Sequence, residues 1–128
     1  MSQPAAFTPT VERLNALRDE VAPGPVVMLN LLKFNAPDGL AAFGRYGAIT
    51  APLIEAAAAK VLYAGQAGPA IASHESGDWD MVILVEFPSI DAFVTMVGGD
   101  TYQNEAAPIR PEALERTLWM VSQPTPGA

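Results

Sequence analysis

Hydrophobic residues recur every three to four positions near the start of the chain, a spacing typical of an amphipathic helix. This stripe consists of Val11, Leu14, Leu17 and Val21, with charged residues at most of the positions between them. Thr8 followed by Pro9 matches a helix N-cap with proline at the first helical position. The run from Pro23 to Pro25 ends the pattern. We therefore predict an N-terminal helix over residues 9–21.

Short apolar runs without helical spacing predict four strands. They cover residues 26–33, 60–67, 80–87 and 114–122. The second run contains Gly65, and glycine inside a strand often marks a bulge or a bend. We therefore expect that strand to be irregular near Gly65.

Two longer helical patterns lie between these strands. Residues 40–59 are rich in alanine and predict a helix that is kinked or broken at Pro52, which has no amide hydrogen to donate. A second helix begins after Ser89, which is placed to cap it. Asp100 and Gln103 resemble a capping box for one more short helix.

The order of these elements predicts the fold class. After the N-terminal helix, the chain reads strand–helix–strand–strand–helix–strand, which is the split βαβ or ferredoxin-like arrangement of the α+β class. It gives a four-stranded antiparallel sheet with two helices on one face. The 128 residues suit a single domain, with the core at about 24–123 and a frayed tail at 124–128.

The predicted strands are apolar on both faces. In the first strand, one face carries Val27, Leu29 and Leu31, and the other carries Val26, Met28 and Leu32. An antiparallel sheet covered on one side only should alternate apolar with polar residues. We therefore expect a second copy of the chain to pack sheet against sheet, which forms a dimeric α/β barrel. The alternative is that the N-terminal helix lies across the open face.

Composition and charge exclude several classes of function. The chain has no cysteine and one histidine, His74, so we expect neither a metal site nor a cofactor. Its net charge is −7, and residues 61–128 carry only Arg110 and Arg116 as cations. This acidic half argues against binding to nucleic acids or anionic membranes. Residues 1–10 lack the features of a secretory signal, and no apolar run reaches the roughly 18 residues of a membrane span, so we expect a cytoplasmic protein.

Several sequence blocks together resemble a known family. They are Pro25–Phe34 (PVVMLNLLKF), Gly77–Asp80 (GDWD) and Leu84–Ser89 (LVEFPS), followed by Ala92-Phe93, with single matches at Tyr46, Tyr102 and Arg110. This combination over residues 24–123 resembles a small bacterial family of domains of unknown function in the dimeric α/β-barrel superfamily. The resemblance implies a homodimer whose two sheets face each other. The superfamily includes cofactor-free monooxygenases, haem enzymes, lactone isomerases and members without assigned activity, so the resemblance implies no particular reaction.

Two polar residues in apolar surroundings are candidates for a site. Asn30 interrupts the first strand, and a buried amide must find hydrogen-bond partners. Arg110 lies in the predicted helix-to-strand connection, where its guanidinium could clamp a carboxylate or an enolate oxygen. The structural alternatives are an amide that satisfies nearby backbone and an ion pair of Arg110 with Asp80 or Glu86.

The remaining candidates have simpler alternatives. Asp80 beside Trp79 could act as a base, or it could stabilise the turn before the third strand. His74 could be a haem ligand, although an exposed loop residue is the more common role. The aromatic residues could line a flat pocket for an aromatic ligand, or they could simply pack in the core. They are Tyr46, Tyr63, Tyr102 and Trp119.

Two functional hypotheses follow from these residues. The first is a homodimeric small-molecule-binding protein without an assigned reaction, whose pocket lies between helices and sheet. Its ligand-binding candidates are Asn30, Tyr46, Trp79, Tyr102 and Arg110. The alternative is a cofactor-independent, monooxygenase-like or isomerase-like enzyme for an aromatic or enolisable substrate. Its catalytic candidates are Asn30, Arg110 and Asp80, of which Asn30 and Arg110 would stabilise an oxyanion.

Overall fold

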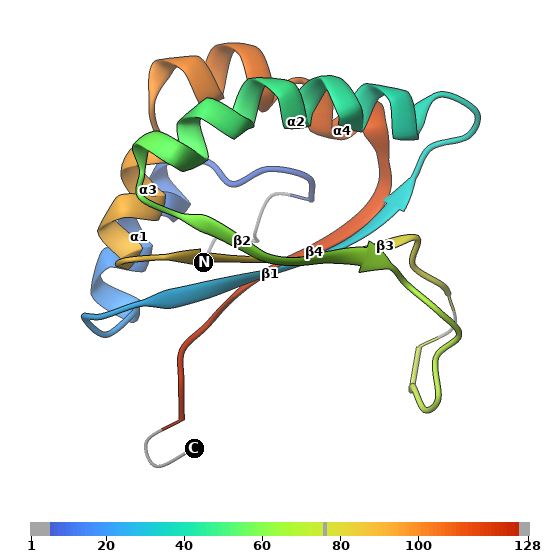
Figure 1. The fold of residues 1–128 in the computed structure, drawn as a ribbon, viewed down its shortest axis with the longest axis horizontal. Helices are drawn as coiled ribbons and strands as arrows, with labels where there is room; N and C mark the ends of the chain where they lie inside the picture. The colour runs from blue at the N-terminus through green and yellow to red at the C-terminus, as the bar shows by residue number, and fades with distance from the viewer. Residues whose placement is uncertain (1–5, 76, 126–128) are drawn as a thin grey trace.

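The computed structural model describes residues 6–75 and 77–125 (Figure 1). The elements in chain order are α1 (Val11–Glu20), β1 (Val26–Phe34), α2 (Gly39–Ala56), β2 (Lys60–Gln66), β3 (Met81–Phe87), α3 (Ile90–Val97), the π-helical turn η1 (Tyr102–Ala106), α4 (Ile109–Ala113) and β4 (Leu114–Ser122). The segment tested for a secretory signal and the predicted frayed tail fall partly outside the described residues, at 1–5 and 126–128.

The four strands form one antiparallel sheet in the order β2-β3-β1-β4. This order, with helical segments between β1 and β2 and between β3 and β4, confirms the predicted ferredoxin-like α+β fold. Figure 1 shows α2 and α4 over one face of the sheet, with α3 and α1 at one end. The helices therefore divide the sheet into a helix-covered face and an open face.

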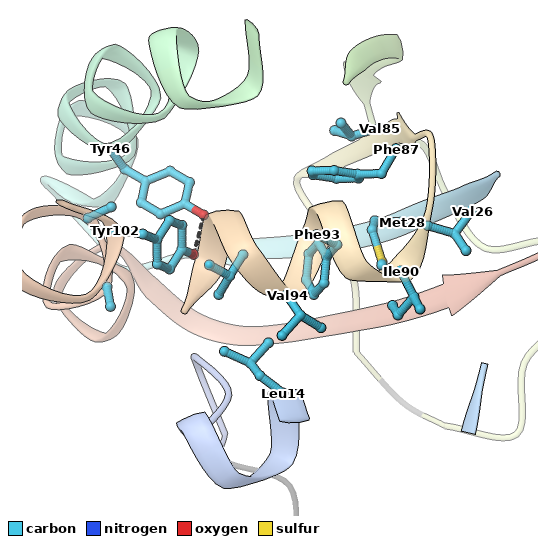
Figure 2. Packing of buried hydrophobic residues seen from close by; sticks show 13 residues of the cluster. Leu14, Val26, Met28, Tyr46, Val85, Phe87, Ile90, Phe93, Val94 and Tyr102 are labelled. Carbon is cyan, nitrogen blue, oxygen red and sulfur yellow. Dashed lines mark hydrogen bonds between the residues drawn. The ribbon is translucent and has the colours of Figure 1, made fainter. Parts of the chain in front are cut away.

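The hydrophobic core lies between the helices and the helix-covered face. Alternate residues of β1 are buried there, and β3 and α3 supply most of the rest. The fully or nearly fully buried members include Leu14, Val26, Met28, Phe87, Phe93, Val94, Val97 and Tyr102 (Figure 2). Leu14 of α1 lies next to Val94 of α3, so α1 extends the helical layer. The alternative that α1 lies across the open face is therefore wrong.

The open face of β1 carries Val27, Leu29 and Leu31, one of the two apolar sets that the sequence distinguishes. Leu29 of β1 lies between Leu84 of β3 and Met120 of β4 in the strand register. Leu118 and Met120 are 42% and 47% exposed, which is high for large apolar side chains in a sheet. Within residues 6–75 and 77–125, no helix packs on this face, so it is available to another surface.

The helix caps follow local hydrogen bonding. Ser89 caps α3 as predicted, because its hydroxyl accepts a hydrogen bond from the amide of Ala92 at 3.1 Å. The cap of α1 is Thr10 and not Thr8, because Thr10 has the extended backbone of a cap and accepts from the amide of Arg13 at 3.0 Å. The helix therefore covers residues 11–20 and is shorter than predicted.

Two other local predictions need correction. The α2 helix continues through Pro52 without a break. The bulge in β2 lies at Leu62, between Val61 and Tyr63, and not at Gly65. Glycine is needed at position 65 for a steric reason, because a Cβ atom there would collide with the ring of Tyr63. The missing side chain makes room for an aromatic neighbour on the same face of the strand.

The segment after α3 also differs from the prediction. The Gln103 amide donates to the carbonyl of Val97 at 2.7 Å, so it does not complete a capping box with Asp100. Arg110 lies in the predicted connection to β4, which is itself the short helix α4. Pro111 does not break this helix, because it falls in the first turn, where no amide hydrogen is needed. This short helix fixes the direction of the Arg110 side chain.

Candidate functional site

A cavity of about 340 Å³ lies between α2 and the helix-covered face of the sheet. Ala51 on α2 and Val61 and Ala64 on the edge strand β2 line it and are exposed, so it opens between these two elements. Most of its wall is apolar, with side chains of Met28, Phe43, Ile54, Ile83, Val85, Phe87 and Met96. The space can therefore hold an apolar molecule that enters past β2.

The inner end of the cavity is polar, and it is built around Arg110. This residue is 1% exposed, and its guanidinium lies 4.3 Å from the centre of the Trp119 ring and 5.4 Å from that of Tyr46. Asn30, Tyr46 and Trp119 line the cavity beside it. Asn30 is opposite Trp119 in the pairing of β1 with β4, so the sheet register holds these two side chains next to each other.

The hydrogen bonds of Arg110 all go to neutral oxygen atoms. Its Nη1 donates to the hydroxyl of Tyr46 at 3.3 Å. Its Nη2 donates to Asn30 Oδ1 at 3.4 Å and to Thr117 Oγ1 at 3.3 Å. Its Nε donates to the backbone carbonyl of Phe7 at 2.5 Å. The guanidinium is therefore held in place by dipoles from four different parts of the chain.

The predicted ion pair of Arg110 with Asp80 or Glu86 is wrong. Asp80 lies 3.4 Å from the ammonium of Lys33, and Glu86 lies 3.4 Å from that of Lys60. Among the residues that the structure describes, no carboxylate lies within ion-pairing distance of Arg110. The inner end of the cavity thus carries a buried positive charge without a counter-charge from the described chain.

A pair of tyrosines supports this end of the cavity from behind. The hydroxyls of Tyr46 and Tyr102 lie 2.6 Å apart, and their rings meet edge to face (Figure 2). Burial raises the pKa of the Tyr102 phenol well above its ordinary value, and the neighbouring Tyr46 adds to this effect while Arg110 opposes it. Tyr102 is therefore a neutral partner that orients Tyr46, and Tyr46 alone of the two lines the cavity.

One hydrogen-bond donor at the inner end lacks an acceptor. The side-chain amide nitrogen of Asn30 makes no hydrogen bond to any described residue, although Asn30 is 8% exposed. Buried polar groups normally find partners, so a donor without an acceptor beside a cavity marks a place for a bound acceptor.

The structure brings four of the five predicted ligand-binding residues together. Asn30, Tyr46 and Arg110 line the cavity, and Tyr102 contacts Tyr46 behind it. Trp79 lies elsewhere, with its ring 4.5 Å from the guanidinium of Arg116.

The other predicted candidates also lie outside the cavity. Asp80 accepts a hydrogen bond from the amide of Phe34 at 2.9 Å, so its carboxylate fixes the end of β1. His74 is exposed in the loop between β2 and β3, and Tyr63 is half exposed on the open face. Neither Asp80 nor His74 therefore has a position from which it could act on a molecule in the cavity.

Sequence reasoning missed two residues that hold Arg110. Phe7 contributes its backbone carbonyl, and its ring packs against the small cluster around Leu32 and Leu114. A backbone contact over more than a hundred residues of sequence leaves no local signal. Thr117 does leave one, because it is a polar residue at a position of β4 that faces the helices, paired with Leu32.

A larger hollow of about 490 Å³ lies along the edge strand β4, beside α1 and the N-terminal segment. Trp119 and Met28 line both hollows and separate them. The charged residue that lines this second hollow, Arg13, is partly exposed and already paired with Glu20 at 2.5 Å. The hollow therefore lacks the buried, unpaired charge that distinguishes the cavity under α2.

Comparison with known proteins identifies a family without an assigned function. Residues 31–124 match the family described as "Domain of unknown function (DUF1330)", in agreement with the resemblance of the sequence blocks. A protein of unknown function from Rhodopseudomonas palustris, RPA0582, is 30% identical, with a TM-score of 0.81 over 94% of this chain and 98% of that one. No curated protein matches the chain.

More distant structures share the fold alone. The Arabidopsis thaliana protein At3g17210 is 18% identical, with a TM-score of 0.61 over 78% of this chain and 95% of that one. A protein from Bacteroides fragilis, described as dimeric, of unknown function and with a ferredoxin-like fold, is 15% identical, with a TM-score of 0.52 over 80% of this chain and 99% of that one. Finally, none of the helices in the described part of the chain has both the length and the apolar character needed to cross a membrane.

Proposed function

Because the chain belongs to the DUF1330 family of domains of unknown function, we propose its function from the cavity under α2. The protein is a homodimeric small-molecule-binding protein without an assigned reaction. The observation that carries this proposal is the cavity itself, about 340 Å³ in size, with apolar walls and one polar end at Arg110. Ligand pockets typically combine such walls with a few polar groups that orient the bound molecule.

Two glycines of α2 provide a matched test of the cavity. A Cβ added to Gly47 or to Gly44 meets no atom within 4 Å, so both positions accept a larger side chain. Gly47 lines the cavity, whereas Gly44 is exposed and does not. Gly47→Leu fills the cavity, and Gly44→Leu makes the same chemical change outside it. Both variants should fold, because leucine favours a helix more than glycine does.

The measurement is ligand-induced stabilisation in thermal unfolding, confirmed by calorimetric titration. The probes are phenylacetate and cinnamate with their neutral amides, phenylacetamide and cinnamamide. We expect at least one probe to stabilise the parent protein and Gly44→Leu, and none to stabilise Gly47→Leu. Binding that survives in Gly47→Leu, or the absence of binding to the parent by every probe, contradicts the proposal.

The homodimer is proposed to form through the open face of the sheet. Three features support it: the apolar residues around Leu29, the exposure of Leu118 and Met120, and the description of the Bacteroides fragilis protein of the same fold as dimeric. Burying this face favours association through the hydrophobic effect. Light scattering at low micromolar concentration should give about twice the chain mass of 13.5 kDa. A monomer at that concentration contradicts the dimer.

The enzyme hypothesis is favoured by one observation, the group of donors at the inner end of the cavity. Arg110 and Asn30 could stabilise an oxyanion that develops on a bound substrate. Among the described residues that line the cavity there is no carboxylate or imidazole to act as a base, so the substrate itself would have to supply the reactivity. Turnover of an enolisable aromatic substrate, lost in Gly47→Leu and retained in Gly44→Leu, would establish an enzyme.

The proposal also places the protein in the bacterial cytoplasm. The relative from Rhodopseudomonas palustris, similar over almost its whole length, supports a bacterial setting. Fractionation of bacterial cells that express the chain tests the location. Recovery in the culture medium or with the membranes contradicts a cytoplasmic protein.

A further inference from the structure

The charge at the inner end of the cavity indicates which kind of molecule binds there. We infer that the ligand is a monoanion, a carboxylate attached to a flat apolar body, whose charged end pairs with Arg110. This inference rests on the proposed binding function of the cavity and specifies its ligand. It starts from an imbalance of charge and of hydrogen bonds within the described chain.

The charge imbalance comes from Arg110. Its guanidinium stays charged at every pH at which proteins are studied, and it is 1% exposed. Burying a charge is unfavourable unless an opposite charge accompanies it. Its partners are the neutral oxygens of Tyr46, Asn30, Thr117 and Phe7, which solvate the charge without neutralising it. An anion in the adjacent cavity supplies the opposite charge.

The hydrogen-bond imbalance points in the same direction. Asn30 lines the cavity, and its amide nitrogen donates to no described residue. A carboxylate is acceptor-only and can take several hydrogen bonds on its two oxygens. It therefore accepts from the amide of Asn30 and also pairs with the charge of Arg110, which a cation or a hydrocarbon does not.

The rest of the lining limits the ligand to one charge. Of the described residues around the cavity, Arg110 is the only one that is charged, so a dianion would keep one charge unpaired in an apolar site. Beyond the polar end, the walls consist of aromatic and aliphatic side chains such as Phe43, Phe87 and Ile83. Such walls suit the flat apolar body of an aromatic or unsaturated acid.

The experiment compares carboxylates with neutral amides of the same shape. Cinnamate is titrated against cinnamamide, and phenylacetate against phenylacetamide, in Tris–chloride near neutral pH without any carboxylate buffer. We expect each carboxylate to bind the parent protein about tenfold or more tightly than its amide, because hydrogen bonds to a charged group are the stronger ones. This comparison needs no substitution, so it does not depend on the folding of a variant.

Substitution of the arginine then assigns the preference to its charge. Arg110→Gln should abolish the preference for carboxylates, and Arg110→Lys, which keeps the charge, should retain part of it. Arg45→Gln removes an exposed arginine of α2 that pairs with Glu112 and does not line the cavity, so it should leave the preference unchanged. The secondary structure of each variant is checked by circular dichroism.

The possible results separate the inference from the proposed function. Equal affinity for amides and carboxylates in the parent protein overturns the monoanion while leaving the binding function in place. A carboxylate preference that persists in folded Arg110→Gln also overturns it. Failure of every probe to bind removes the proposed function and this inference with it. A preference present in the parent and in Arg45→Gln, and absent in Arg110→Gln, establishes the inference.

Discussion

The positions of single side chains around the cavity depend on contacts between distant segments. Arg110 of α4 is held by Asn30 of β1, Tyr46 of α2, Thr117 of β4 and the carbonyl of Phe7. None of these partners is charged, and none except Thr117 is close to Arg110 in sequence. The roles of these residues can therefore be separated by substitutions that remove one contact at a time.

Asn30 is expected to contribute to binding more than to stability. Its hydrogen bond with Arg110 is long, at 3.4 Å, and its amide nitrogen has no described acceptor. Asn30→Leu should change the free energy of unfolding by less than about 1 kcal/mol, because the buried amide gains little from the fold. The same change should weaken cinnamate binding about tenfold. Thermal unfolding and calorimetric titration measure the two effects.

Thr117→Val is the matched control for Asn30. Thr117 also accepts from Arg110, but its hydroxyl donates to the carbonyl of Leu31 at 2.9 Å, and it does not line the cavity under α2. We expect it to lose about 1 kcal/mol of stability and to bind cinnamate with nearly unchanged affinity. A large loss of stability in Asn30→Leu would show that the amide is structural.

The raised pKa of Tyr102 predicts a loss of stability in alkaline solution. An unfolded tyrosine ionises near pH 10, whereas burial keeps Tyr102 protonated in the folded protein to higher pH. Its contribution is therefore constant below about pH 10. Above that pH the unfolded chain releases the proton and the folded chain retains it, so stability falls by up to about 1.4 kcal/mol per pH unit.

Tyr102→Phe should remove this part of the alkaline loss. At neutral pH the variant loses only the hydrogen bond to Tyr46, worth about 1 kcal/mol, and Tyr46 keeps its bond with Arg110. Urea unfolding at a series of pH values measures the slope. Tyr63→Phe changes a half-exposed ring on β2, so this variant should still lose stability above about pH 10 as the parent protein does. Identical slopes in parent and Tyr102→Phe would contradict the prediction.

At the scale of helices and strands, the sequence predicts much of the architecture. Apolar runs locate the four strands correctly, and hydrophobic spacing locates the two longest helices. The errors are local. Thr8 and Thr10 both suit a cap, and only the hydrogen bond to Arg13 decides between them. The capping box with Gln103 fails because its side-chain amide instead donates to the carbonyl of Val97, the last residue of α3.

The candidate site was predictable only in part, because contacts between distant segments decide which side chains meet. Asn30 and Arg110 stand out because each is polar or charged in an apolar context. Asp80 and Trp79 looked equally suitable, since sequence spacing does not show which end of a strand lies beside a cavity. Lys33 and Arg116 decide their roles, and both are distant in sequence. The spacing of apolar residues in the sequence shows which face of a helix or strand is buried. Which side chains pair with each other depends on tertiary contacts that the spacing does not show.

Substitution of Pro52 measures how much the missing backbone hydrogen bond in α2 lowers the stability of the protein. It lies inside the helix, is exposed, and cannot donate to the carbonyl of Ala48. Pro52→Ala restores this hydrogen bond and should raise the free energy of unfolding by about 1–3 kcal/mol. Pro69→Ala, in the exposed loop after β2, has no helix to complete and should not stabilise the protein. A loss of stability in Pro52→Ala would mean that packing requires the proline.

At the scale of the whole molecule, the sheet separates two regions with different tasks. The cavity and its buried arginine lie on the helix-covered face, and the apolar open face lies on the other side. Figure 1 shows the described parts of the loop between β2 and β3, together with residues 123–125 after β4, on the side away from α2. Ile71 in that loop is fully exposed. Both segments therefore flank the open face, where they can add contacts to a second copy packed against it.

Leu29 lies at the centre of this face and provides the sharpest test of the dimer. Its neighbours in register are Leu84 and Met120, so a lysine there places a charge in the middle of the proposed interface. Leu29→Lys should therefore dissociate the dimer, since an unpaired buried charge is unfavourable and the charge is tolerated only in the solvated monomer. Light scattering should give the chain mass of 13.5 kDa instead of about twice that value.

Leu40→Lys is the control for this change. Leu40 is 61% exposed on α2, on the other side of the sheet, so a lysine there adds the same charge without meeting the proposed interface. This variant should remain a dimer. Circular dichroism must show that both variants are folded, because a dissociated but unfolded chain would not report on the interface. A folded Leu29→Lys that stays dimeric would place the contact between copies elsewhere, and the apolar open face would then need a different partner.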